Sequence, residues 1–153
     1  MKRPSVPELW SRLSPLPGGK TLFSKILGRA APYTGTIDAR VTELSPGHAV
    51  VTLGDRKAVR NHLNSIHAIA LMNLGEVATG LAVMAGVDGR GRGIITHLGM
   101  DYTKKARGRI TATCDAELPT QPGKHDVEVV ATLRDASGDA VATAHARWRV
   151  DLT

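Results

Sequence analysis

Glu76 is the side chain in this sequence best placed to do acid–base chemistry. It is the only acidic residue between Asn61 and Val87, and no Lys or Arg lies between Arg60 and Asp88. A carboxylate buried without a partner is costly, and its desolvation raises the pKa toward the range where a general base works. The pattern predicts a catalytic carboxylate. Two structural alternatives remain: Glu76 faces solvent at a helix end, or it pairs with an arginine from a strand.

Two polar residues, Asn61 and His67, lie where the same apolar segment begins. Backbone N–H groups at a helix start lack intrahelical acceptors and attract negative charge. Together with the Asn61 amide, they could hold the oxygen of a polarised carbonyl group. The alternative is that Asn61 and Asn64 only form a loop and that His67 is a hydrogen-bonded core histidine.

A long buried helix must position these side chains. Between Asn61 and Val87 the apolar residues fall on every side of a helical wheel, which is typical of a helix enclosed by other elements. Ser65 is the expected N-cap. Gly75 and Gly80 each cost roughly 1 kcal/mol of helix propensity relative to alanine, so we expect a neighbouring element to approach the helix closely there.

The rest of the chain predicts a sheet and two short helices. Alternating apolar and polar residues indicate strands, and short connections favour antiparallel pairing. The fold class is therefore α+β, with an antiparallel sheet of five to six strands wrapped around one long buried helix. The predicted strands are Thr36–Leu44, His48–Gly54, Gly93–Thr103, Arg109–Leu118, Val127–Leu133 and Ala142–Leu152, and the short N-terminal helices are Val6–Leu13 and Lys20–Arg29.

Composition narrows the possible partners. The 153 residues fit one domain, and the single cysteine excludes an internal disulfide framework and a thiolate-rich zinc site. We predict no metal, no membrane span and a cytoplasmic location. The net charge of +6 favours an anionic partner, either nucleic acid or a phosphorylated small molecule. Aromatic residues make up only 3% of the chain, which argues against binding of single-stranded nucleic acid by base stacking.

The spacing of Asn61, His67 and Glu76 resembles that of hotdog-fold acyl-CoA thioesterases of the phenylacetic-acid-pathway type. Their pattern is Asn, then His-Gly-Gly, then an acid within the central helix. The strings Arg60-Asn61-His62, Gly75-Glu76 and Tyr102 to Gly108 are closer still to a bacterial DUF4442-type branch of that superfamily. The resemblance covers about residues 20–152. It implies a single hotdog domain over residues 1–153, with a helical extension at 1–32 and the hotdog core at 33–153.

The same resemblance implies a role for each matching residue. Glu76 would activate water or attack a thioester carbonyl itself, and Asn61 would polarise that carbonyl. Ala68 would offer its backbone N–H to the oxyanion, Thr103 would hold the attacking water, and His67 stands at the histidine of the motif. The family builds each site between two subunits. A homodimer or a dimer of dimers is therefore implied, with the acid and the oxyanion donors in different subunits.

The acyl-CoA substrate implied by the resemblance would place its phosphates near basic residues. Candidates are Arg60, Lys104, Lys105 and Arg107, although any of them could simply be solvated. Coenzyme A would be part of the substrate, and no separate cofactor is expected.

The chain departs from the family pattern at Ile69, because His-Gly-Gly reads His67-Ala68-Ile69. The bulkier Ile69 would narrow the path of the acyl or pantetheine group. This departure motivates a second hypothesis, a non-catalytic protein that binds acyl-CoA or fatty acyl groups. A nucleic-acid binder is the third hypothesis, and only the net charge supports it.

Overall fold

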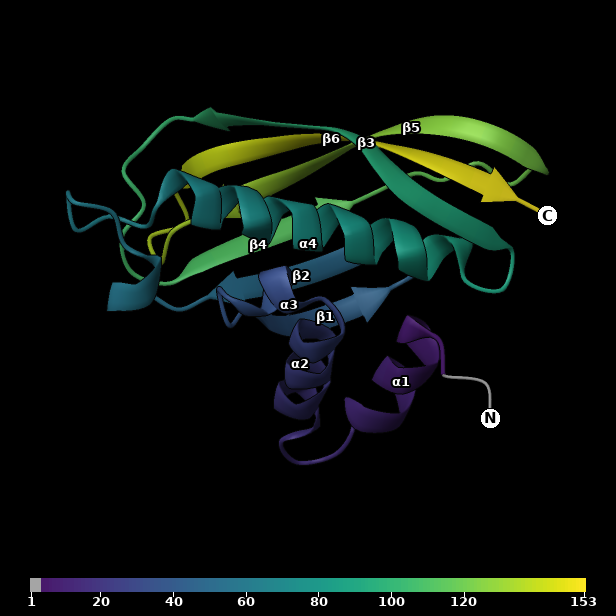
Figure 1. Cartoon of the computed structure of the whole chain (residues 1–153), viewed down its shortest axis with the longest axis horizontal. Coiled ribbons are helices and arrows are strands. Elements are labelled where there is room, and N and C mark those ends of the chain that lie inside the picture. Colours follow the sequence, from purple (N-terminus) through teal and green to yellow (C-terminus); the bar gives the residue numbers. More distant parts are fainter. Residues whose placement is uncertain (1–3) are drawn as a thin grey trace.

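The computed structural model describes residues 4–153, and Figure 1 shows one central helix against a curved sheet. The helices are α1 (Val6–Leu13), α2 (Gly19–Ala30), α3 (Pro32–Gly35) and α4 (Ala68–Val87), with a 3-10 turn at Lys57–Val59. The strands are β1 (Arg40–Ser45), β2 (His48–Leu53), β3 (Gly91–Tyr102), β4 (Ile110–Asp115), β5 (Gly123–Arg134) and β6 (Ala140–Leu152).

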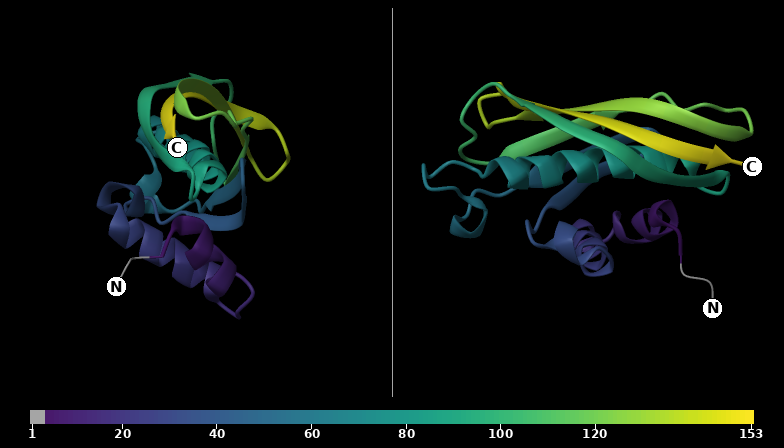
Figure 2. Two further views of the ribbon diagram at one scale, coloured as in Figure 1. Left: turned by 90° about the vertical axis from the view of Figure 1, so that its right-hand side faces the viewer. Right: turned by 45° about the horizontal axis from the view of Figure 1, so that its top comes forward.

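The six strands form one antiparallel sheet in the order β1-β2-β4-β5-β6-β3. The sheet curls around α4, and α1 and α2 lie outside it, beside β1 (Figures 1 and 2). Every second residue of β4 and β6 points into the core, as the alternating sequence pattern predicts. The prediction of a hotdog fold, with a sheet wrapped around one long helix and short N-terminal helices, is confirmed.

The helix α4 packs closely against the sheet at its two glycines. A Cβ atom on Gly75 would lie 2.6 Å from the Cβ of Ala144, and one on Gly80 would lie 3.1 Å from the Trp148 ring. The expected close approach of a neighbouring element is confirmed, and β6 is that element. The helix has the length and hydropathy of a membrane span, but 67% of its most apolar window is buried within the described residues, as in the core helix of a soluble domain.

The predicted N-cap of α4 is wrong. The helix begins at Ala68, and the Nδ1 atom of His67 accepts the Ile69 N–H at 3.0 Å. Upstream, the Ile66 N–H donates to the Ala106 carbonyl at 2.7 Å, which keeps the chain extended. Ser65 therefore lies before the helix, buried, with an Oγ atom that has no partner in residues 4–153.

The predicted strand Thr36–Leu44 is shorter at its beginning. The chain first forms α3, and Asp38 then adopts the left-handed conformation with φ 51° while its N–H donates to the Gly35 carbonyl. Pairing with β2 starts only at Arg40. The alternation of Ile37 and Ala39 with polar residues misled the prediction, because local turn hydrogen bonds replace the strand ladder there.

Candidate active site

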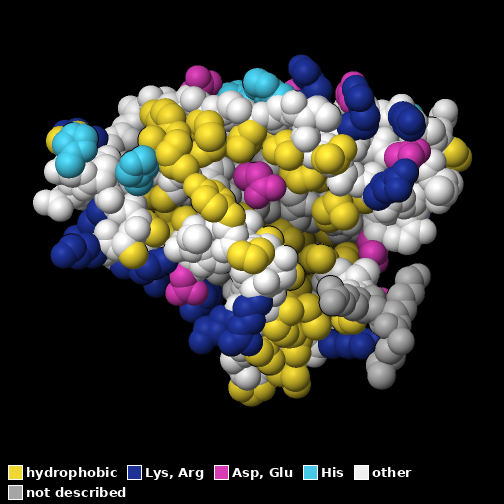
Figure 3. Space-filling model, in the orientation of Figure 1, with side chains coloured by type: hydrophobic (Ala, Val, Ile, Leu, Met, Phe, Trp, Pro, Cys, Tyr) yellow, Lys and Arg dark blue, Asp and Glu magenta, His cyan; other side chains and the backbone are white. Residues whose placement is uncertain are grey.

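Glu76 lies midway along α4, on the side that the sheet does not cover. Its side chain is half-buried and borders a cavity of about 180 Å³. The other residues that line this cavity are almost all apolar: Val6, Leu27, Ala31, Thr34, Val77, Gly80, Leu81, Met84 and Trp148. Figure 3 shows hydrophobic side chains gathered along the course of α4 with an acidic group among them.

The Glu76 carboxylate has no partner in the described part of the chain. No hydrogen bond or ion pair to it is present within residues 4–153, and burial raises its pKa above the ordinary value of 4.5. It is neither at a helix end nor paired with an arginine from a strand, so the two structural alternatives do not hold. A raised pKa makes this carboxylate a stronger base than an ordinary glutamate, which suits general-base catalysis.

A second cavity brings together five of the ten residues expected to form the site. It has about 330 Å³ and lies between the start of α4 and the chain that follows β3. Its lining includes Asn61, Ala68, Thr103, Lys104 and Lys105. The geometry places these five positions around one cavity, and their roles in catalysis and substrate binding stay a prediction.

Within this cavity, hydrogen bonds of the loop orient Asn61. Its Oδ1 atom accepts the N–H groups of Leu63 at 2.9 Å and Ser65 at 3.2 Å. The two contacts form an Asx-type turn, so Asn61 is a loop former as the alternative proposed. They also leave the Nδ2 group, which has no acceptor in residues 4–153, as the part of the side chain free to donate. The two interpretations of Asn61 are therefore compatible.

The first turn of α4 leaves two backbone donors, the N–H groups of Ala68 and Ala70, without an acceptor in residues 4–153. The Ile69 N–H donates to His67, whereas the Ala68 N–H has no acceptor within the described residues. The Ala68 carbonyl accepts the Tyr102 hydroxyl at 2.8 Å, which fastens the helix start to the end of β3. His67 thus acts as a helix cap. The Ala68 N–H is available to a ligand oxygen, as the family resemblance implies.

The four basic residues differ in their availability. The Lys104 ammonium forms ion pairs with Asp135 at 2.7 Å and with Asp139 at 2.8 Å. The Arg60 guanidinium forms an ion pair with Asp55 at 2.6 Å. Lys105 and Arg107 are exposed and have no ion pair in residues 4–153. Among the four, these two are therefore the cations best able to meet a phosphate group.

Thr103 and Ile69 also occupy defined positions. The Thr103 hydroxyl donates to the Ala140 carbonyl at 3.0 Å, so it can only accept a hydrogen bond from a bound water. The Ile69 side chain is 50% exposed. It lines a further cavity of about 190 Å³ with His67 and Arg60, beside the start of α4.

The carboxylate and the oxygen-binding donors are separated within one chain. Glu76 follows Ala68 by eight residues, which corresponds to about 12 Å along a helix axis. The cavities around Glu76 and around Asn61 share no lining residue. A single chain therefore does not bring the acid and the donors to one carbonyl group.

The described residues support neither catalysis by the Cys114 thiol nor a metal site. Cys114 is buried, and desolvation together with the neighbouring Asp115 raises the pKa of its thiol to about 12, so it stays protonated. Within residues 4–153 no group of three or more His, Cys, Asp or Glu side chains is arranged to bind a metal ion.

Sequence reasoning missed the residues that surround the carboxylate. Trp148 and Met84 border the Glu76 cavity, and Tyr102 fixes the helix start. The strand alternation places Trp148 on the inward face, but only the packing of β6 against α4 shows that it borders the same cavity as Glu76. No sequence signal identified Tyr102 as a partner of Ala68.

Comparisons with known proteins agree with this architecture. A family model described as "Domain of unknown function (DUF4442)" matches residues 19–150. The solved structure of a structural-genomics protein, APC5556, is 27% identical with a TM-score of 0.83, covering 97% of this chain and 99% of that one. No curated protein matches the chain significantly.

Two further solved structures have names that mention an activity. A Pseudomonas aeruginosa protein of unknown function, named "Probable Thioesterase", is 21% identical with a TM-score of 0.77 and covers 90% of this chain and 97% of that one. A thioesterase family protein from Silicibacter pomeroyi is 17% identical with a TM-score of 0.71, with coverage of 85% and 96%. At these identities the similarity establishes the fold.

Proposed function

The chain belongs to the DUF4442 family and has the hotdog fold, and from this premise we propose that it is an acyl-CoA thioester hydrolase with Glu76 as its catalytic carboxylate. The main support is the half-buried Glu76 carboxylate, which borders an apolar cavity with no ion pair or hydrogen bond from residues 4–153. Thioesterase names among proteins of the same fold are consistent with this activity.

In the proposed reaction Glu76 acts as a general base toward water. The water oxygen bonds to the thioester carbonyl carbon while its proton passes to the carboxylate, giving a tetrahedral intermediate with a negatively charged oxygen. Collapse of that intermediate breaks the carbon–sulfur bond, and the leaving thiolate takes the proton from the Glu76 carboxyl group. The products are a carboxylic acid and free coenzyme A. Direct attack by Glu76, followed by hydrolysis of an anhydride, reaches the same products.

The Asn61 Nδ2 group and the Ala68 N–H are the donors proposed for the charged oxygen. Because they lie away from Glu76 in their own chain, we propose that they meet the Glu76 of a second copy. The edge strand β3 offers a docking surface for that copy: no strand pairs with its outer edge in residues 4–153, and Ile94 is 65% exposed. A long unpaired edge with an exposed apolar side chain favours pairing with another chain.

The phosphates of coenzyme A would lie near Lys105 and Arg107, which have no ion pair within the described residues. The thiol product requires a reducing environment to stay free, so we propose that the protein acts in the cytoplasm. No cofactor takes part in the proposed reaction, because water, Glu76 and backbone donors supply every proton and charge that it needs.

A thiol-release assay over acyl-CoA substrates of different chain length tests the proposal. We expect Glu76→Gln to lose about 100-fold or more of kcat/KM, since a positioned base contributes on that order. Glu117→Gln is the matched control, because Glu117 is exposed in the segment that follows β4. Far-UV circular dichroism checks that both variants fold. Hydrolysis by Glu76→Gln at the wild-type rate would exclude the assignment.

A non-catalytic acyl-CoA binding protein is the second candidate, and the half-exposed Ile69 beside Ala68 favours it. This candidate predicts that CoA esters raise the melting temperature without any release of thiol. In that case Ile69→Gly, which restores the glycine of the family pattern, should produce measurable turnover. Wild-type hydrolysis of any acyl-CoA would eliminate it.

A further inference from the structure

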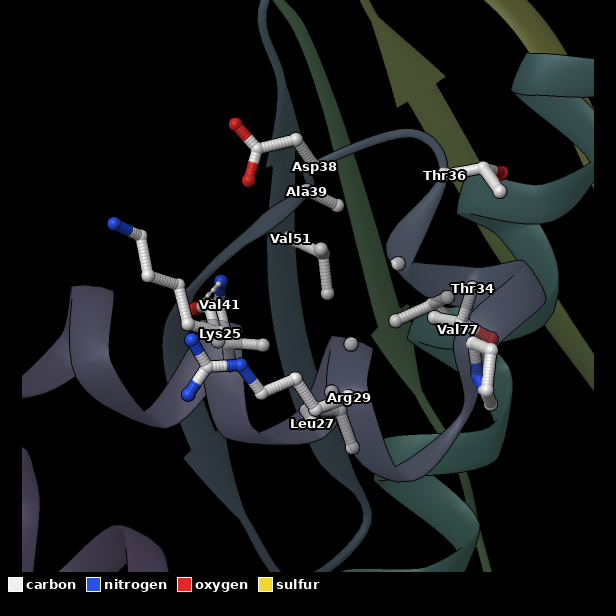
Figure 4. A pocket seen from close by; sticks show the side chains of 14 residues that line it. Lys25, Leu27, Arg29, Thr34, Thr36, Asp38, Ala39, Val41, Val51 and Val77 are labelled. Atoms are coloured by element: carbon white, nitrogen blue, oxygen red, sulfur yellow. Dashed lines mark hydrogen bonds between the residues drawn. The ribbon is translucent and has the colours of Figure 1, made fainter.

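A further cavity lies outside the candidate active site, between α2 and the strands β1 and β2. It has about 610 Å³, within the range of small-molecule pockets. Its walls come from α2, α3, β1, β2 and one side chain of α4, and they include the apolar residues Leu27, Ala39, Val41, Val51 and Val77. Figure 4 shows it between α2 and the strands.

Hydrogen bonds at one end of α2 explain why the cavity opens at the other. The Lys20 ammonium donates to the Thr42 carbonyl at 2.8 Å, and the Val41 N–H donates to the Ser24 hydroxyl at 2.9 Å. These contacts fasten the first half of α2 to the edge strand β1. Beyond Ser24 the helix and the chain before β1 are not joined in this way, so a wedge-shaped space remains between them.

Two cations stand at the rim of this space. Lys25 and Arg29 are four residues apart on α2, both are exposed, and neither has an ion pair in residues 4–153. Figure 4 shows both side chains rising from the helix on the same side of the cavity. Like charges at this spacing repel each other and weaken a helix. A bound anion between them would remove that repulsion.

The only acidic residue that lines the cavity does not neutralise these cations. The Asp38 carboxylate pairs with Arg40 at 2.7 Å. Lys25, Arg29, Asp38 and Arg40 together therefore leave two positive charges at the mouth of an apolar cavity. This combination suits a ligand with an apolar chain and one anionic head group.

We propose that the cavity under α2 binds an amphipathic anion, with its head group at Lys25 and Arg29 and its chain against Val51 and Val77. The head group is a carboxylate or a phosphate, which these cations recognise in the same way. Leu27, Thr34 and Val77 line both this cavity and the Glu76 cavity, whereas Glu76 itself does not line this one. A ligand bound here would therefore be next to the candidate active site but outside it. The proposal does not depend on thioester hydrolysis.

Isothermal titration calorimetry with dodecanoate, dodecyl phosphate and dodecanol tests this site. We expect the anions to bind more tightly than the alcohol, and Lys25→Glu/Arg29→Glu to weaken anion binding by about tenfold or more. Arg109→Glu/Lys124→Glu changes the net charge equally at exposed positions elsewhere and should bind as the wild type does. Tighter binding of dodecanoate or of dodecyl phosphate identifies the head group, and both results support the site.

A second variant tests the chain-binding part of the cavity. Ala39→Phe places a ring in the space beside Val41 and should abolish binding, whereas Ala136→Phe in an exposed turn should not. Unchanged affinity in Lys25→Glu/Arg29→Glu would overturn the proposal. The proposal would also be overturned if Glu76→Gln changed the affinity for the anion and Lys25→Glu/Arg29→Glu did not, because the ligand would then occupy the Glu76 cavity.

Discussion

The Glu76 carboxylate and the Trp148 ring both lie next to Gly80, around the same cavity. A Cβ atom on Gly80 would be 3.9 Å from Glu76 Oε1 and 3.1 Å from the Trp148 ring. The missing side chain at position 80 therefore leaves the space beside the carboxylate open. Gly80 costs helix propensity and lies where the proposed chemistry needs room.

Gly80→Ala should reduce hydrolysis without unfolding the protein. The added methyl group would narrow the space next to Glu76 and displace substrate or water from its reactive position. We expect a decrease of about tenfold or more in kcat/KM, since small misplacements at a reacting centre are costly. The gain in helix propensity of about 1 kcal/mol should offset the adjustment of Trp148. Steady-state kinetics and a melting curve check both parts, and unchanged kinetics would contradict the prediction.

Gly75→Ala should instead destabilise the fold. Its Cβ atom would lie 2.6 Å from the Cβ of Ala144, and neither atom can move without shifting α4 or β6. Overpacking costs about 1–3 kcal/mol and better helix propensity contributes about 1 kcal/mol in the other direction, so we expect a net loss of stability of up to about 2 kcal/mol. Urea unfolding measures this loss. A Gly75→Ala variant more stable than the wild type would show that the two elements separate easily.

The alternation of apolar and polar residues predicted the helices and strands well where one face of an element packs against the core along its whole length. The first helix, Val6–Leu13, has the predicted bounds, and six antiparallel strands surround the apolar helix. The errors fall where a long-range hydrogen bond decides a boundary. The bond from Ile66 to Ala106 moves the helix start to Ala68, and no local pattern around Ser65 contains that information.

The candidate site was also only partly predictable, because some of its features depend on contacts between residues far apart in the sequence. Glu76 stood out because its own segment has no cation, and the structure provides none from elsewhere in the described residues. The availability of the basic residues was not predictable, because Lys104 finds its two aspartates across a hairpin more than thirty residues away. The cation pair Lys25 and Arg29 had a visible signal, since α2 has no acidic residue, but the cavity behind it depends on tertiary packing.

The ionisation of Glu76 should make the stability of the protein depend on pH. Burial raises its folded-state pKa above 4.5. A carboxyl group shifted in this direction stabilises the fold fully only below its unfolded pKa, and the contribution is lost as the pH rises through the folded pKa. Above its folded-state pKa the wild type therefore holds a desolvated charge that Glu76→Gln lacks.

We expect Glu76→Gln to be more stable than the wild type at pH 7, and the difference to disappear below about pH 4. Urea unfolding across this range measures it, and Glu117→Gln should show no comparable trend, because Glu117 is exposed. Equal stability of Glu76→Gln and wild type at every pH would mean that water solvates the carboxylate fully, which is incompatible with the proposed base.

A site shared between two copies should be recoverable from two inactive variants. Glu76→Gln lacks the base and Asn61→Ala lacks an amide donor, so each homodimer contains only defective sites. In a mixed dimer, one site combines both altered residues and the other combines both intact ones. Random exchange of subunits should therefore restore about a quarter of the wild-type activity, because half of the dimers are mixed and each has one intact site.

The measurement is thiol release after the two variants are unfolded together and refolded, compared with the sum of the variants refolded separately. Ile94→Arg in both chains is the control: a charge on the exposed β3 edge should prevent pairing, give a monomer in analytical ultracentrifugation and abolish the recovery. Activity in the Ile94→Arg monomer would place the complete site within one chain. The 12 Å or so of helix between Ala68 and Glu76 would then have to be bridged by a movement of α4.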